Sequence, residues 1–337
     1  MASSQDRVQL IKNIEKTLNT SLICYVTGDR ENLNTRIAPD VIRIIYRHLK
    51  AMGPQEKISL FLYTRGGDVL TPWRLVNLLR EYCNHLSILV PFRAYSAGTL
   101  ICLGGDEIIM GKLGELSPID PSVANAFNPQ DRNNKAARIP VSVEDVTSFI
   151  GLAQEMAGLK KEEHIKDVFL RLSEKVHPLA LGNVHRNYSL IRYMGKKLLK
   201  LHFKDSSPNS SDELINSIIS NLTEELFAHN YMISRSEARE SIRLPVTYPP
   251  EDLENIMWEL YESYEECLNL TEPFNPALLL KNHEQQLDFE ASGGIIESKH
   301  CLDLFVFEGI ITRDPRKEGD QSPVNLEMIR QKWKNIK

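Results

Sequence analysis

The sequence predicts an α/β fold built on a mostly parallel β-sheet. Between residues 57 and 123, short apolar runs that suit buried strands alternate with amphipathic stretches of helical spacing. Alternation of this kind favours parallel strands joined by right-handed crossovers. We therefore expect four strands to lie next to one another in one sheet, near residues 22–26, 58–63, 86–90 and 106–110.

The N-terminal part of the chain follows the same alternation. Apolar residues at helical spacing around positions 8–14 predict a first helix, and residues 22–26 (LICYV) predict the first strand. A polar loop over residues 27–36 comes before a second amphipathic helix, which ends near Gly53-Pro54 because these residues terminate helices.

Two short motifs follow the next two predicted strands. Gly66-Gly67 comes directly after residues 58–63, and glycines there let backbone N–H groups turn outward without a Cβ clash. Ser96 follows residues 86–90, stands among small residues and opens an apolar helix. Either motif alone is most simply a glycine turn or a serine N-cap. Together they favour acyl transfer, with Ser96 as nucleophile and the N–H groups of Gly67 and Ala97 as an oxyanion hole.

These motifs resemble the serine dehydrogenase proteinase family of the Clp protease/crotonase superfamily, which is related to signal peptide peptidase A. The similarity covers about residues 10–310, and its shared pieces include LFLYTRGGD, LSPIDP, AHNYMISRSEA and the most specific one, the serine-elbow block VPFRAYSAGTLICLGGDEIIMG. The resemblance implies a Clp protease/crotonase-like fold and a serine peptidase acting on polypeptide substrates. We place Gly66 and Tyr95 in substrate binding on the same basis.

The general base is not settled by the sequence. His229 titrates near neutral pH and could be oriented by Asp120, so a Ser96–His229–Asp120 triad ranks first. Lys112 ranks second, by resemblance to the serine–lysine dyad of signal peptide peptidase A, and it would need burial to lower its pKa. The structural alternatives are a locally hydrogen-bonded His229, a turn-stabilising Asp120 and a solvated Lys112.

The remaining chain divides into a helical segment and a C-terminal extension. We expect a serine protease domain over residues 1–245 with a helical insertion at about 142–225, and an α+β extension over residues 246–337. Residues 287–312 alternate and predict a small antiparallel sheet, and the basic tail predicts a terminal helix. Polar residues 125–140 are either a flap or a plain surface loop. The resemblance implies that the insertion pairs subunits in a homo-oligomer.

Composition narrows the functional classes. The 337 residues are 42% hydrophobic and carry a net charge of −5, which gives no reason to expect nucleic acid or an anionic membrane as partner. The five cysteines are scattered and fit buried free thiols, and no residue spacing indicates a metal or a cofactor. The sequence has no apolar signal core and no run of about 20 apolar residues, so we expect a cytoplasmic protein.

Two alternatives to the peptidase remain open. A catalytically inactive scaffold or peptide-binding protein would keep the fold and its groove. This alternative stays open because the sequence contains no clear general base. A crotonase-like acyl-CoA enzyme would use the same two N–H groups for a thioester enolate, but it needs no nucleophile at position 96. The serine therefore favours the peptidase.

Overall fold

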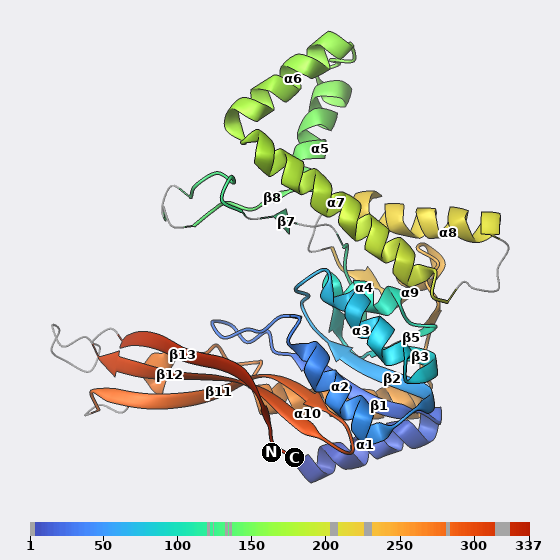
Figure 1. Ribbon diagram of the computed structural model, residues 1–337, viewed down its shortest axis with the longest axis vertical. Helices are drawn as coiled ribbons and strands as arrows, with labels where there is room; N and C mark the ends of the chain where they lie inside the picture. The colour runs from blue at the N-terminus through green and yellow to red at the C-terminus, as the bar shows by residue number, and fades with distance from the viewer. Residues whose placement is uncertain are drawn as a thin grey trace. The chain divides into compact units, whose positions relative to one another are not determined.

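The computed structural model describes residues 4–119, 122–123, 125–131, 134, 137–202, 208–225, 231–280, 284–313 and 324–337 (Figure 1). The chain forms two compact units. The first contains Met1–Leu116 and Ile233–Lys337, and the second is Ser117–Met232. Each unit is described by itself below.

The first unit is organised around an eight-stranded sheet in the order β10-β5-β3-β2-β1-β11-β12-β13 (Figure 1). Neighbouring strands from β10 to β1 are parallel, and neighbouring strands from β1 to β13 are antiparallel. The parallel strands are β1 (Ser21–Thr27), β2 (Gln55–Tyr63), β3 (Cys83–Val90), β5 (Glu107–Met110) and β10 (Val246–Thr247). The prediction that four of these strands are adjacent is therefore confirmed.

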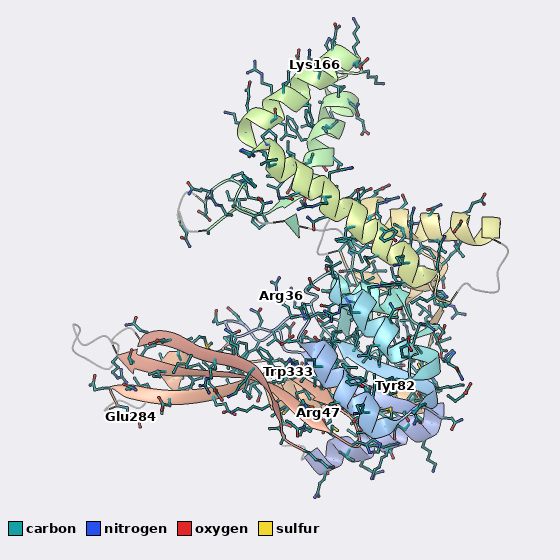
Figure 2. The ribbon with its side chains drawn as sticks, in the orientation of Figure 1. Arg36, Arg47, Tyr82, Lys166, Glu284 and Trp333 are labelled. Atoms are coloured by element: carbon teal, nitrogen blue, oxygen red, sulfur yellow. The ribbon has the colours of Figure 1, made fainter. Side chains whose placement is uncertain are left out.

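The antiparallel part consists of β11 (Gln286–Glu297), β12 (Leu302–Arg313) and β13 (Val324–Asn335). The sequence predicts a small antiparallel sheet over residues 287–312; β11 and β12 are antiparallel there, but β11 also pairs with β1 and continues the main sheet. The predicted terminal helix is wrong, because that segment is β13. Its basic residues pair across strands, as when Lys332 binds Glu308 on β12 at 3.2 Å. Trp333 donates its ring N–H to Asp40 at 3.0 Å (Figure 2). The division at residue 245 stays a prediction.

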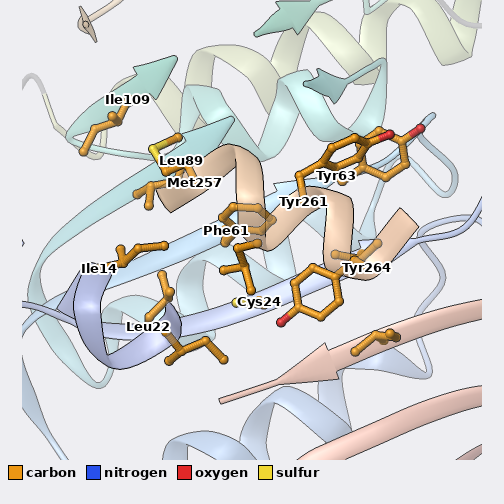
Figure 3. Close-up of a cluster of buried hydrophobic side chains, with 14 of the residues drawn as sticks. Ile14, Leu22, Cys24, Phe61, Tyr63, Leu89, Ile109, Met257, Tyr261 and Tyr264 are labelled. Atoms are coloured by element: carbon orange, nitrogen blue, oxygen red, sulfur yellow. The ribbon is translucent and has the colours of Figure 1, made fainter. Parts of the chain in front are cut away.

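Helices cover both faces of this sheet. Two helices, α1 (Ser4–Leu18) and α10 (Glu251–Leu268), pack on one face, where they bury Cys24 and Phe61 (Figure 3). Because side chains alternate along a strand, Ile23 and Leu60 face the other side. The helices α2 (Val41–Met52), α3 (Thr71–Arg80) and α4 (Ala97–Leu103) belong to that side. Packing on both faces holds the parallel strands in place, and the candidate site lies at the carboxyl ends of β2 and β3.

Short elements complete the first unit. The strands β4 (Arg93–Ala94), β6 (Glu115–Leu116) and β9 (Ile233–Ser234) form a three-stranded sheet. The helix α9 (Arg235–Glu240) follows β9, and Ser234 caps it by accepting the N–H of Glu237. A 3₁₀ turn, η3 (Pro276–Leu278), lies between α10 and β11.

The second unit is mainly helical. It contains β7 (Ser122–Val123), β8 (Val141–Ser142), α5 (Val143–Gly151), η1 (Leu152–Met156), α6 (Glu162–Lys175), α7 (Pro178–Leu199), α8 (Pro208–Ser220) and η2 (Asn221–Glu225). Ser142 and Asp145 form a capping box at the start of α5. The long helix α7 begins at Pro178, directly after His177, whose side chain caps it by accepting the N–H of Leu179.

Candidate functional site

The two motifs lie side by side at the carboxyl ends of β2 and β3. Thr64 follows β2, and its N–H donates to the carbonyl of Arg93 at 2.9 Å. Its own carbonyl accepts the N–H of Tyr95 at 3.0 Å. The buried Thr64 hydroxyl oxygen accepts the N–H of Gly66 at 3.0 Å and the hydroxyl of Thr27 at 2.8 Å. Thr64 therefore fixes the glycine pair against the chain that contains Ser96.

Ser96 has a left-handed backbone, with φ 52° and ψ −108°. Few non-glycine residues adopt positive φ, and the strain is typical of a nucleophile elbow, in which a sharp strand-to-helix turn presents a serine hydroxyl. Ser96 is partly exposed, and α4 begins at the next residue. The helix must approach closely here, since a Cβ on Gly98 would lie 2.5 Å from Thr64 Cγ2.

Gly66 lies directly against Ser96. A Cβ built on Gly66 would be 2.9 Å from Ser96 Cβ and 3.3 Å from Ser96 Oγ. The φ of Gly66 is +98°, a value that L side chains rarely adopt. Both the backbone conformation and the contact with Ser96 therefore require glycine at this position.

The Gly67 N–H faces away from its neighbouring segment. Ile37 donates to the Gly66 carbonyl at 2.9 Å and accepts from Asp68 at 2.8 Å, which forms a parallel bridge opposite Gly67. In such a bridge the hydrogen bonds come from the flanking residues, so the Gly67 N–H points to the other side. Among the described residues, neither this N–H nor that of the fully buried Ala97 finds an acceptor. Both donors predicted for the oxyanion hole are thus uncommitted within the described chain.

Tyr95 is fixed by two charged neighbours. Its hydroxyl donates to the Glu115 carboxylate. Arg93 Nε lies 3.6 Å from the same Glu115 oxygen, and Arg93 Nη1 lies 3.5 Å from Asp29 Oδ2. Burial, and next the hydrogen bond to Glu115, raise the pKa of Tyr95 to about 12. This network positions the residue immediately before Ser96.

Alkaline pH is expected to weaken the fold through Tyr95. An exposed tyrosine ionises near pH 10, whereas Tyr95 in the folded chain stays protonated to about pH 12. Between these values the unfolded chain binds fewer protons, so the free energy of unfolding falls as the pH rises. Urea midpoints measured from pH 9 to pH 12 should drop less steeply in Tyr95→Phe than in the wild type. Equal slopes would contradict this contribution.

Lys112 lies in the turn after β5 and is 67% exposed. Its Nζ is 3.7 Å from Glu254 Oε2, and its backbone N–H also donates to Glu254, which lies on α10. The structure therefore gives it the surroundings of a surface cation with an acidic partner. The other two candidates for proton transfer, His229 and Asp120, lie outside the described residues.

A second serine–histidine–aspartate set lies elsewhere and is closed to substrate. His48 Nδ1 is 2.9 Å from Ser298 Oγ, and His48 Nε2 is 3.0 Å from Asp303 Oδ2. All three side chains are at most 2% exposed. The set joins α2 to the antiparallel strands, and its burial indicates a structural role.

A long N-terminal stretch of the chain matches a known protein family. Residues 5–168 match the ClpP-like SDH-type serine proteinases. This stretch is similar to that family. Because it contains Gly66, Gly67, Ser96 and Ala97, the resemblance drawn from the sequence is confirmed, and it supports a peptidase at the level of the family.

Two uncharacterized proteins of Methanocaldococcus jannaschii are similar to this chain. One is 27% identical over 219 residues, which cover 65% of this chain and 63% of the relative. The other is 23% identical over 267 residues, or 77% of this chain and 76% of the relative. The chain thus matches less than two thirds of the first relative's length. Neither relative's description names an activity.

Several residues of the site were not singled out from the sequence. Thr64 follows the predicted strand and is the hydrogen-bonding centre, but a threonine at a strand end is common. Ile37 and Glu115 act through pairings with distant segments, and nothing near them in the sequence indicates those pairings. Thr64 had one usable signal, since it directly precedes the glycine pair.

Neither a metal-binding cluster nor a membrane-spanning helix is found among the described residues. Within them, no group of three or more histidine, cysteine, aspartate or glutamate side chains is placed to hold a metal ion. In the same part of the chain, no helix has both the length and the apolar character of a membrane span.

Proposed function

We propose that the chain is a serine peptidase that hydrolyses polypeptides through an acyl-enzyme on Ser96. The observation that supports this most directly is the strained Ser96 backbone, placed against Gly66. Strain at a nucleophile persists only where the surrounding structure enforces it, as Thr64 and Gly98 do here. We also propose that the parallel part of the sheet has the Clp protease/crotonase-like arrangement.

In the proposed reaction, Ser96 Oγ attacks the carbonyl carbon of the scissile peptide while a general base takes its proton. The N–H groups of Gly67 and Ala97 stabilise the oxyanion of the tetrahedral intermediate. That intermediate collapses when the protonated amine leaves, and water then hydrolyses the ester on Ser96. Gly66 and Tyr95 border the substrate in this proposal.

The base is proposed to be His229, oriented by Asp120, with Lys112 as the alternative. A lysine serves as a base when burial favours its neutral form. Lys112 is mostly exposed and lies 3.7 Å from Glu254, so it lacks the burial that a lysine base needs. The structure of the described residues therefore gives the histidine alternative more support.

A fluorophosphonate probe tests the proposal, because it phosphonylates an activated serine hydroxyl with loss of fluoride. The purified full-length chain should react with one equivalent, and peptide mass spectrometry should find the adduct on Ser96. A chain that stays unlabelled while a known serine hydrolase in the same tube reacts would favour an inactive, peptide-binding scaffold.

We propose in addition that the helical unit mediates a homo-oligomer. Apolar side chains are exposed on α5 and η1, with Leu152 57% exposed, Met156 81% and Phe149 40%. Patches of this kind on helices are typical of interfaces. Sedimentation velocity at micromolar concentration should show an oligomer that Leu152→Glu weakens, and a monomer at all concentrations would contradict it. A cytoplasmic location stays a prediction from the sequence.

A further inference from the structure

A cavity of about 440 Å³ lies at the carboxyl ends of the parallel strands, next to the candidate site. Its lining includes Asp29 after β1, Tyr63 and Arg65 at the end of β2, Arg93 on β4, and Tyr261 and Glu265 on α10. Ligands of open α/β sheets bind at this end of the strands, and 300–1,000 Å³ is the usual size of a ligand pocket.

The walls of the cavity are aromatic and held by mutual packing. The rings of Tyr63 and Tyr261 lie side by side with their centroids 4.9 Å apart (Figure 3). Phe92 meets Tyr261 edge to face at 5.6 Å. Such walls suit the aliphatic stem of a long side chain and attract a cation.

The charged groups of the inner cavity are predominantly acidic. Asp29 accepts the Tyr63 hydroxyl at 2.8 Å and is 11% exposed. Arg93 is shared between two carboxylates, those of Asp29 and Glu115, so its positive charge is already compensated.

The carboxylate of Glu265 is held in place without a cationic partner. It accepts the Tyr261 hydroxyl at 3.0 Å, and within the described part of the chain no cation lies at ion-pair distance from it. Arg65 and Glu31 also line the cavity, but both residues are exposed to solvent. A cation in the cavity would therefore meet a carboxylate that is fixed and otherwise unpaired.

The cavity is within reach of a peptide bound at Ser96. Arg65 directly precedes Gly66, whose missing Cβ faces Ser96. Since consecutive Cα atoms are about 3.8 Å apart, Arg65 Cα lies within roughly 8 Å of Ser96 Cβ. An extended peptide advances about 3.3 Å per residue, so side chains two or three residues from the cleaved bond span this distance.

We propose that this cavity is a substrate subsite for a lysine or arginine side chain, two or three residues from the scissile bond. The inference rests on the proposed peptidase function and adds a substrate preference to it. The aliphatic stem packs on the tyrosine rings, and the cationic end binds Glu265 with Asp29 behind it.

Binding to the Ser96→Ala protein tests the subsite without turnover. The probes are fluorescein-labelled alanine hexapeptides with a single lysine, norleucine or glutamate at each position in turn, and the readout is fluorescence polarisation. At one or two positions, lysine should bind about fivefold more tightly than norleucine, and glutamate should bind most weakly. Equal affinities for the three series, or no binding by any lysine peptide, would overturn the proposal.

A matched pair of variants assigns the preference to the cavity. Glu265→Gln keeps an acceptor for Tyr261 but removes the charge, so it should abolish the lysine preference in the Ser96→Ala background. Glu262→Gln is the matched control. Glu262 lies less than one turn earlier on α10, outside the cavity, and accepts the ring N–H of Trp258 at 2.8 Å. This variant should keep the lysine preference. Survival of the preference in Glu265→Gln would refute the assignment. If Ser96 fails to react with fluorophosphonate, the proposed peptidase function is wrong, but these binding results remain valid.

Discussion

Ser96→Ala is expected to reduce peptide hydrolysis by at least roughly a thousandfold, as the loss of a serine nucleophile does in enzymes of this kind. The variant removes one hydroxyl from a partly exposed side chain and keeps the Cβ that packs against Gly66. Folding should therefore be preserved, and circular dichroism with urea unfolding checks this. Initial rates on a quenched fluorescent casein substrate measure the loss.

Two comparisons make this result decisive. Ser87→Ala removes a hydroxyl from β3, the strand that leads to the elbow, and should leave hydrolysis unchanged. His229→Ala should fall to a residual rate close to that of Ser96→Ala, since members of one catalytic unit are not additive, while Lys112→Ala should lose far less. An inactive Lys112→Ala beside an active His229→Ala would transfer the role of base to the lysine. A wild-type rate in Ser96→Ala would show that Ser96 is not the nucleophile.

The parallel sheet could be predicted because its signal is local. Each of β1, β2, β3 and β5 is a short apolar run, and burial on both faces removes the need for alternation. The end of each run also located the two motifs, since the glycine pair and Ser96 directly follow β2 and β3. Right-handed crossovers then place these two ends at the same edge of the sheet.

The C-terminal strands and the contacts of the site depend on distant partners instead. Val324–Asn335 contains basic and apolar residues at spacings that also suit a helix, and only pairing with β12 makes it a strand. The bridge between Ile37 and Gly67 joins segments 30 residues apart, and the contact of Tyr95 with Glu115 joins residues 20 apart in the sequence. Tertiary pairing decides such cases, and no local pattern records it.

Gly67→Ala is expected to lower hydrolysis by about a hundredfold and the free energy of unfolding by about 2 kcal/mol. A Cβ at this position would lie 2.1 Å from the Ile37 carbonyl oxygen and 2.6 Å from its nitrogen. Both contacts are with backbone, so no side chain can rotate away and the bridge itself must shift. That shift turns the Gly67 N–H, whose direction the bridge sets, away from the oxyanion that it is proposed to bind.

Gly53→Ala separates the two effects of this substitution. Gly53 has a φ of +72°, and a Cβ built there would meet no atom within 4 Å. An alanine at position 53 therefore has only the cost of a backbone conformation that is essentially restricted to glycine, about 1–3 kcal/mol, and should leave the rate of hydrolysis unchanged. If Gly67→Ala is destabilised but hydrolyses peptides as fast as Gly53→Ala, its N–H is not an oxyanion donor. A loss of kcat with KM nearly constant is the result expected of a donor that acts in the transition state, because its hydrogen bond strengthens only as the oxyanion forms.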